Sequence, residues 1–291
     1  MKPTITDVRV HPGDSAFLID DGQTSVLYDT GFGFTGKQLA GNIQAILGER
    51  NLDYVFLTHS HYDHVLGVCH VKKAYPKAKI VAGEYVKKIF SKPSARETMR
   101  RLDQGAAMKA GVTDYEDLTD ELHVDIAVCD GEEITCGGMT FRVISLPGHT
   151  KCSIGFYHAE SGLLLGTETL GVYFGGGAYL PSYLVGYRMT LDSFAGIKEL
   201  DVRRLLIPHY GAVEQAEARA FLDGSERAAV DTAERIKEIF RSGGSKEDAF
   251  AYFRERFYIP RIRPTYPIDA FNLNTSILIS LIEKELAAQE G

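Results

Sequence analysis

The sequence predicts a mixed α/β fold that is followed by a helical extension. Short apolar runs between turn residues, which are typical of β-strands, alternate with segments in which apolar residues recur at helical spacing. Beyond His209 the strand pattern stops and helical spacing continues. The length of 291 residues suits one large α/β domain with an extension. We therefore expect a domain over residues 1–212 and a helical extension over residues 213–291.

Three strands are expected near the N-terminus. They cover Val8–Val10, Ser15–Asp20 and Thr24–Asp29, and an Asp-Gly pair between the second and the third favours a hairpin. The third strand ends at Asp29, so a carboxylate stands at a strand terminus. A helix over Lys37–Leu47 is expected next, because its apolar residues fall on one face.

A histidine-rich turn follows the next expected strand, Tyr54–Leu57. The turn, Thr58-His59-Ser60-His61-Tyr62-Asp63-His64, places three histidines and an aspartate within six positions. His59 and His61 alternate, so on an extended backbone their side chains point to the same side. Imidazole with carboxylate suits zinc, iron or manganese far better than calcium or magnesium. A solvated loop has no need of histidine at this density, and the turn therefore predicts a metal site.

Further candidate ligands stand at the ends of later strands. The segment from Glu84 to Asp120 predicts one or two surface helices. The strands expected around it are Ala78–Ala82, Ile126–Val128, Glu133–Ile134, Met139–Ser145, Ser153–Tyr157, Gly162–Gly166 and Arg204–Ile207. His149 comes after a Pro-Gly turn, Glu168 follows one strand and His209 follows the last. We interpret His11, His70 and His123, which stand alone, as ordinary histidines.

The order and spacing of these residues closely resemble the metallo-β-lactamase superfamily. Its hallmarks are a strand-terminal Asp, the pattern HxHxDH, a later Gly-His, a later acidic residue and a final His. The resemblance covers roughly the first 210 residues. It implies a four-layer αββα sandwich, with metals bound at one edge of two facing sheets. Glyoxalase II and its relatives form one branch that this chain is similar to.

The resemblance also implies a role for each candidate residue. One metal ion would be bound by His59, His61 and His149, and a second by Asp63, His64 and His209. Asp29 matches the family carboxylate that supports the ligand loop without binding metal. Where the family usually has an Asp that bridges the two metal ions, this chain has Glu168, whose side chain is longer by one methylene. Glu168 could therefore bridge both ions, bind only one of them, or shift the second ion. Two divalent ions are expected, zinc before iron or manganese.

The mechanism that fits this site is metal-assisted hydrolysis of a small ester, thioester, amide, lactone or phosphoester. Asp63 is the expected catalytic residue, which orients the water or moves the proton. The alternative is an iron-dependent oxidoreductase similar to the persulfide dioxygenases, which need only two histidines and a carboxylate. The flavin-linked diiron reductases use HxExDH, and His61 stands where they have Glu. The additional second-metal positions in this chain favour a dinuclear hydrolase.

Composition excludes several other classes of protein. The net charge of -7 and the absence of a basic segment argue against nucleic-acid binding. No apolar stretch is long enough to span a membrane, and the N-terminal residues do not resemble a signal peptide. Four cysteines without CxxC spacing fit reduced thiols in a cytoplasmic protein. Cys152 is interpreted as a packing residue, with a redox role as the alternative.

The substrate pocket is expected to involve the Gly- and Tyr-rich segment 171–188, whose alternative is a surface or subunit-contact loop. Candidates for substrate contact are Tyr173, Tyr183, Tyr187, Arg188, Tyr210 and Lys151. The C-terminal helices, expected over 225–241, from Ser245 and over 270–288, either pack in a core, line the pocket or form a homodimer. The apolar run Ile277–Ile282 predicts a last helix that is buried, either against the body of the protein or against another subunit.

Overall fold

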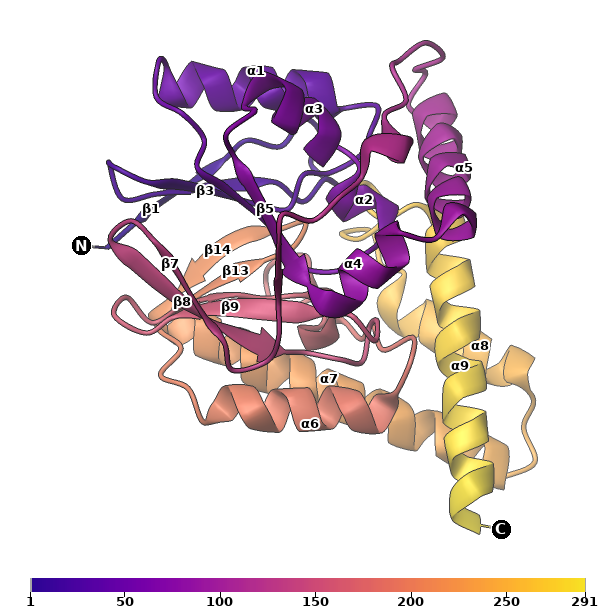
Figure 1. Ribbon diagram of the computed structural model, residues 1–291. Coiled ribbons are helices and arrows are strands. Elements are labelled where there is room, and N and C mark those ends of the chain that lie inside the picture. The colour runs from indigo at the N-terminus through magenta and orange to yellow at the C-terminus, as the bar shows by residue number, and fades with distance from the viewer. Residues whose placement is uncertain (1, 291) are drawn as a thin grey trace. The chain divides into compact units, whose positions relative to one another are not determined.

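The computed structural model describes residues 2–290, which fall into two compact units. Unit 1 contains the chain up to Ser145 together with Cys152–Leu165, and unit 2 contains Leu146–Lys151 together with the chain from Gly166 onward. The mixed α/β fold class and the helical C-terminal region are both confirmed (Figure 1). The predicted division of the chain at residue 212 concerns a catalytic part and an extension, and it stays a prediction.

The first sheet of unit 1 has the strand order β1-β2-β3-β4-β5-β6. Its strands are β1 (Thr4–Asp7), β2 (Phe17–Asp20), β3 (Ser25–Tyr28), β4 (Tyr54–Leu57), β5 (Lys79–Gly83) and β6 (Ile126–Val128). β1 to β3 pair antiparallel and β3 to β6 pair parallel. Parallel neighbours need crossover connections, which here contain helices. These helices are α1 (Gly36–Leu47), α2 (Tyr62–Val65), α3 (Val68–Ala74), α4 (Glu84–Phe90) and α5 (Pro93–Lys109), followed by the 3₁₀ turn η1 (Thr119–Glu121).

The other sheet of unit 1 is antiparallel and packs against the first. It contains β7 (Glu133–Cys136), β8 (Met139–Ser145), β9 (Ile154–His158) and β10 (Leu163–Leu165), in the order β10-β9-β8-β7. The ring of Phe56 in β4 lies 5.3 Å from that of Phe141 in β8 and 4.2 Å from that of Phe156 in β9. On the opposite face of the first sheet, α1 and α3 bury Leu39, Ile43 and Val71 against Val55 and Ile80. Both faces of β4 are therefore covered, which explains its uninterrupted apolar sequence.

Unit 2 is built around one long helix, α7 (Gln215–Arg241). The hairpin of β13 (Arg204–Ile207) and β14 (Gly211–Glu214) leads directly into it, and the short hairpin of β11 (Val172–Tyr173) and β12 (Tyr179–Leu180) contacts it through β12. α6 (Tyr187–Lys198), α8 (Lys246–Phe257) and α9 (Ile268–Glu290) pack with it, and η2 (Glu168–Leu170) is a 3₁₀ turn. The predicted capping box at the start of α8 is confirmed, because Ser245 and Asp248 each bond the backbone N–H of the other.

Three predictions about individual elements were wrong. The first strand is Thr4–Asp7 and not Val8–Val10, because the Asp7 carboxylate accepts the backbone N–H of Arg9 and ends the ladder. α7 begins at Gln215, ten residues before the predicted start, and its interior Gly224 lets the Tyr179 ring approach to within 2.4 Å of where a Cβ would lie. β14 was not predicted.

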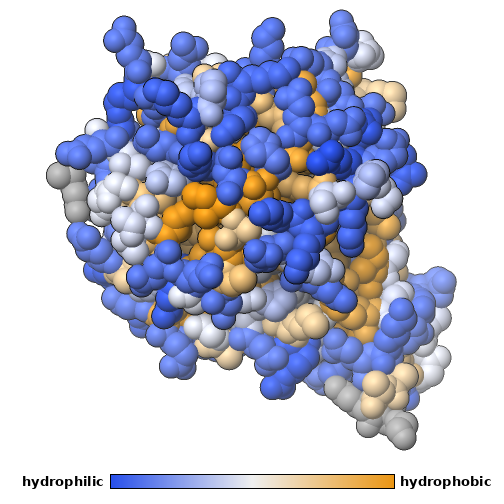
Figure 2. Space-filling model, viewed as in Figure 1, coloured by the Kyte–Doolittle hydropathy of each residue, from blue (hydrophilic) through white to orange (hydrophobic). Residues whose placement is uncertain are grey.

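The last helix is only partly buried within the chain itself, and its predicted burial against another subunit stays a prediction. α9 buries Leu278, Ile279 and Ile282, but Leu273 is 59% exposed and Ile277 is 37% exposed. Figure 2 shows a hydrophobic strip over this helix. The described residues contain no helix that is both long enough and apolar enough to cross a bilayer.

Candidate metal centre

The histidine-rich turn brings its donor atoms together within unit 1. His61 has an extended backbone and directly precedes α2, which contains Asp63 and His64. The ring of His59 lies 4.6 Å from that of His61 and 4.2 Å from that of His64. The nearest nitrogen of His64 is 3.9 Å from a carboxylate oxygen of Asp63. Two ligands that each lie about 2.1 Å from one ion can be at most about 4.2 Å apart, so this pair is close enough to share an ion.

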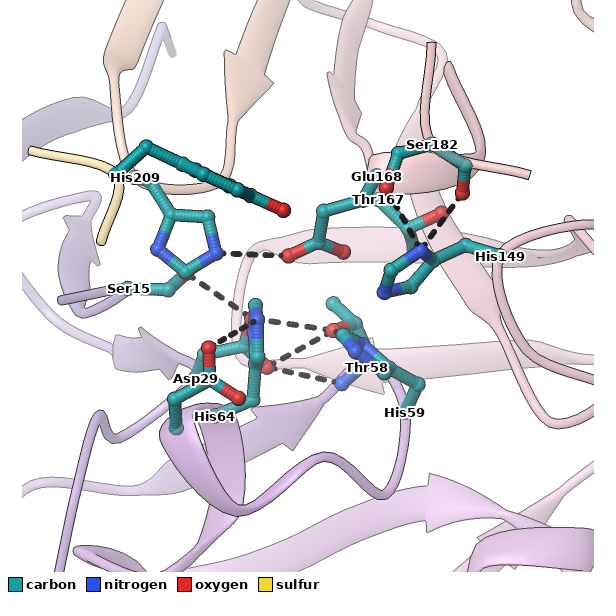
Figure 3. A network of polar contacts seen from close by, with 12 residues as sticks. Ser15, Asp29, Thr58, His59, His64, His149, Thr167, Glu168, Ser182 and His209 are labelled. Atoms are coloured by element: carbon teal, nitrogen blue, oxygen red, sulfur yellow. Dashed lines mark hydrogen bonds and ion pairs between the residues drawn. The ribbon is translucent and has the colours of Figure 1, made fainter. Parts of the chain in front are cut away.

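Asp29 holds the turn through a buried hydrogen-bond network (Figure 3). His64 Nδ1 donates to Asp29 Oδ2 over 2.7 Å, and Ser15 Oγ donates to the same oxygen over 3.1 Å. The backbone N–H and the hydroxyl of Thr58 also donate to this carboxylate. Asp29 is fully buried and has a φ of 51°, a left-handed conformation that Asp adopts more easily than most residues. The sequence predicts that Asp29 supports the ligand loop, and its carboxylate contacts both Thr58 and His64 of that loop.

The network fixes which ring nitrogen carries the proton in His59 and in His64. Both oxygens of Asp29 accept from other donors, so His64 Nδ1 is the protonated nitrogen and its Nε2 keeps a lone pair. The Thr58 hydroxyl donates to Asp29, so its oxygen accepts from His59 Nδ1, which is 3.0 Å away. His59 therefore also presents the lone pair of Nε2. One carboxylate prepares two neighbouring imidazoles to bind a cation.

The loop after Asp29 is joined to the same turn by backbone contacts. The N–H and the hydroxyl of Thr30 both donate to the carbonyl oxygen of His64, over 2.7 Å and 2.9 Å. A Cβ on Gly67 would lie 2.0 Å from the carbonyl oxygen of Thr30, so only glycine fits there. These contacts fix the turn to the end of β3.

In unit 2, His149 lies in a loop that a glycine makes possible. Gly148 has a φ of 145°, and a Cβ there would lie 2.1 Å from Thr190 Oγ1. His149 Nδ1 is 2.8 Å from the carbonyl oxygen of Ser182, which can only accept, and 3.0 Å from its hydroxyl (Figure 3). The backbone N–H of His149 donates to Thr169 Oγ1. His149 Nδ1 is therefore protonated, and its Nε2 keeps the lone pair.

Glu168 and His209 form a second group in unit 2. Glu168 opens η2, and its Oε1 lies 2.9 Å from Nε2 of His209 (Figure 3). This separation matches two adjacent ligands at about 2.1 Å from one ion. His209 follows β13 and has a φ of 63°. Among the described residues, positive φ outside glycine occurs only at Asp29, His209 and Gln215, so two of these three positions are predicted site residues.

The predicted substrate residues occupy different environments. Tyr183 is fully buried in the core of unit 2, and burial raises the pKa of its phenol well above the ordinary value. Burial raises the pKa of Tyr187 to about 12, and it also raises the pKa of Tyr210. Each of these phenols therefore stays protonated at neutral pH. Tyr173 is buried and stacks with Tyr179, with ring centroids 5.4 Å apart.

Of the two predicted basic residues, Lys151 is exposed. The side chain of Arg188 is 81% exposed and pairs with Asp192, one helical turn further along α6. A hollow in unit 2 lies between Ser182 and the C-terminal helices, where Tyr266 and Asn274 line it. The predicted contacts with substrate stay predictions.

The histidines and the cysteine that were interpreted as ordinary have local partners. Nε2 of His70 lies 3.1 Å from the carbonyl oxygen of Glu116, and burial lowers the pKa of this imidazole. His123 is exposed near Asp125. Cys152 packs in the core of unit 1, 3.3 Å from Ser60 Oγ.

Sequence reasoning missed the hydroxyl groups that orient the ligands. Thr58 directly precedes the histidine pattern, and this position was a usable signal. Ser182 lies 33 positions after His149 in an irregular segment, and nothing in the sequence connects the two. Thr169 is likewise joined to the His149 loop only by the fold.

The comparisons with known proteins place the chain in a family. The model of the metallo-beta-lactamase superfamily matches residues 13–209, which is more than half of the chain. The chain belongs to this superfamily. Membership confirms the predicted fold and supports metal binding and hydrolase chemistry in general terms.

Several relatives in the superfamily resemble parts of the chain. Glyoxylase B2 of Dictyostelium discoideum is 29% identical over 144 residues, 48% of this chain and 44% of that protein. The hydroxyacylglutathione hydrolase of Pseudomonas syringae pv. syringae is 30% identical over 210 residues, 69% of this chain and 65% of that protein. The chain matches less than half the length of the Dictyostelium protein and 47% of the hydroxyacylglutathione hydrolase of Cereibacter sphaeroides.

A superfamily member of known structure resembles nearly the whole chain in fold. The metallo-beta-lactamase family protein of Thermus thermophilus superposes with a TM-score of 0.61 at 19% identity, over 97% of this chain and 93% of that one. The archaeal member from Sulfolobus tokodaii gives a TM-score of 0.55 over 75% of this chain and 79% of that one, at 20% identity. At these identities the likeness concerns the fold alone.

The donors in each unit fit the divalent metal ions that the superfamily implies. The two units supply imidazoles with a fixed tautomer at His59, His64 and His149, and carboxylates at Asp63 and Glu168. Neutral imidazole together with carboxylate is the donor set of zinc, iron and manganese sites.

Proposed function

We propose that this superfamily member is a dinuclear metal-dependent hydrolase of small esters, thioesters, lactones or related substrates. The observation that carries the proposal is the Asp29 network, because a single buried carboxylate prepares the Nε2 lone pairs of both His59 and His64. A histidine cluster with a purely structural role would not need this common tautomer.

We assign the proposed ligands as the sequence predicts them. His59, His61 and His149 would hold one ion, and Asp63, His64 and His209 would hold the other. Glu168 is close enough to His209 to bind the same ion, which supports placing this carboxylate at the second ion. Bridging of both ions by Glu168 is part of the same proposal, and metal analysis tests it.

When bound, a divalent ion lowers the pKa of a coordinated water from about 15.7 toward 7 and so supplies hydroxide at neutral pH. The residues of the chain do the rest. Asp29, Thr58 and Ser182 hold the imidazoles in position, so that little reorganisation is needed during the reaction. Asp63 is half-buried and reaches the surface of the turn, where it can accept a proton and pass it to the leaving group.

The metal content and a substrate panel test the proposal. Two zinc ions per chain in the purified protein, with turnover of a thioester, a lactone or a carboxylic ester, are expected. Substituting His61→Ala should abolish turnover, whereas the exposed His123→Ala serves as the matched control and should leave it unchanged. A metal-loaded protein that turns over none of these substrates would refute the hydrolase. One iron per chain with oxygen consumption would favour the dioxygenase-like alternative.

The remaining expectations belong to the same proposal. The substrate is a small molecule and not a nucleic acid, and zinc is the expected metal. A cytoplasmic location and a homodimer that forms through the C-terminal helices are tested by cell fractionation and by light scattering. A monomer at micromolar concentration would dispose of the dimer.

A further inference from the structure

Four aromatic rings form a continuous row that begins in the ligand turn of unit 1. Tyr62, between His61 and Asp63, lies 5.6 Å from Phe32, ring centroid to ring centroid. Phe32 lies 5.1 Å from Phe34, and Phe34 lies 6.1 Å from Tyr115. All four side chains are only half-buried. An apolar surface therefore starts at the candidate metal centre and extends away from it.

The loop after Asp29 displays two of these rings and little else. In the sequence Gly31-Phe32-Gly33-Phe34, each phenylalanine follows a glycine. Because glycine has no side-chain carbon, the two rings are the only bulky side chains of this segment. Gly31 has a φ of 62°, which turns the chain there. A loop that only had to connect β3 to α1 would not need two half-exposed phenylalanines, and binding residues are common on such loops.

A buried carboxylate fixes the row in place. Asp103 of α5 is 2% exposed; it accepts the backbone N–H of Gly33 over 2.9 Å and the Tyr115 hydroxyl over 2.6 Å. Burial raises the pKa of Asp103 above its ordinary value. A Cβ on Gly33 would lie 2.8 Å from the Asp103 carboxylate, so the glycine is required for this approach. A surface that is already ordered loses little entropy when it binds a ligand.

We propose that Phe32, Phe34 and Tyr62 form a specificity subsite, which binds the apolar acyl or aryl part of the substrate. This inference rests on the proposed hydrolase function, because the reacting carbonyl would lie at the ligand turn and the acyl chain along the row. The substrate class that it selects is an ester or thioester whose acyl group is a chain of several carbons or an aromatic ring. Each carbon buried against the rings adds to affinity through the hydrophobic effect.

The first test compares p-nitrophenyl octanoate with p-nitrophenyl acetate as substrates of the zinc-loaded protein. The Phe34→Ala variant should lower kcat/KM for the octanoate by about tenfold or more, because the acyl chain loses the apolar contact with one ring. For the acetate, kcat/KM of the variant should stay within about twofold of that of the natural protein. Tyr85→Ala, which removes a 47% exposed ring of α4, is the matched control and should change neither. An equal loss on both esters would overturn the subsite. Phe34→Leu, which keeps most of the volume, replaces the alanine variant if that one does not fold.

The second test measures binding without catalysis. The chain has no tryptophan, so Phe34→Trp creates a single fluorescent reporter in the row. Octanoate should shift and saturate its emission in the metal-free protein and in the zinc-loaded protein, while acetate at the same concentration should not. If octanoate leaves the emission unchanged, the subsite is refuted. If no ester is turned over but octanoate still saturates the signal, the hydrolase function is refuted and the apolar subsite stands.

Discussion

Substituting Asp29→Asn is expected to weaken metal binding and stability together. Asparagine keeps the shape of the side chain, and it tolerates the left-handed φ of 51° at this position. It removes the negative charge and replaces one acceptor oxygen by an NH₂ donor. Since four donor groups converge on this carboxylate, from Ser15, Thr58 and His64, at least one donor then faces another donor.

The magnitude follows from the contacts that are lost. A hydrogen bond to a charged group contributes about 1.5–3 kcal/mol, and leaving a buried donor unpaired adds to this loss. The free energy of unfolding of the metal-free protein should therefore fall by about 2–4 kcal/mol. Because His64 and His59 lose the acceptor that sets their tautomer, zinc affinity should fall about 10–100-fold.

The assays are urea denaturation and a zinc titration against a chromophoric chelator, with ¹⁵N shifts of the imidazoles as the report on tautomers. Asp53→Asn is the matched control. Asp53 accepts the backbone N–H of Ser25 over 2.9 Å next to the opposite end of β4, and its loss should affect stability alone. Zinc affinity within twofold of the natural protein, with unchanged imidazole shifts, would refute the reasoning about Asp29.

Three further predictions concern Asp63, Gly148 and the bound zinc. Asp63→Ala should lower turnover by orders of magnitude with the fold intact by circular dichroism, and unchanged turnover would end its catalytic assignment. Gly148→Ala should cost about 2 kcal/mol or more in urea denaturation, because a Cβ would lie 2.1 Å from Thr190 Oγ1 at a φ of 145°; Gly41→Ala in α1, where a Cβ meets nothing within 4 Å, should be neutral or stabilising. Removal of zinc by a chelator should lower the melting temperature, since zinc at 100 times its dissociation constant stabilises by about 2.7 kcal/mol, and an unchanged melting temperature would contradict a tightly bound ion.

The features that could be predicted from the sequence are those whose signals are local. The histidine turn occupies seven consecutive residues directly after the apolar run of β4, and its last three residues begin α2. The strands of the parallel part of the first sheet are apolar on both faces, so their runs are easy to recognise. The capping box of α8 is likewise readable within four residues.

The features that were missed depend on contacts between distant residues. The start of α7 was placed too late because Gly224 interrupts the helical pattern, and only the Tyr179 ring packed against it explains the glycine. Asp103 looks like an ordinary polar residue of a surface helix, although its carboxylate is buried under the loop of Gly33. In both cases the sequence shows the residue but not its partner.

The left-handed backbone at His209 supports a functional role for this residue more strongly than its place in the sequence does. For a residue other than glycine this conformation costs about 1–2 kcal/mol, and histidine adopts it less readily than glycine. The tight connection between β13 and β14 could avoid the cost with a glycine, and Gly211 stands only two residues later. The histidine is kept, and its Nε2 lies against the Glu168 carboxylate. Strained residues cluster at functional sites, so a strained histidine that contacts a second prospective ligand favours a role in metal binding over a role in the hairpin alone.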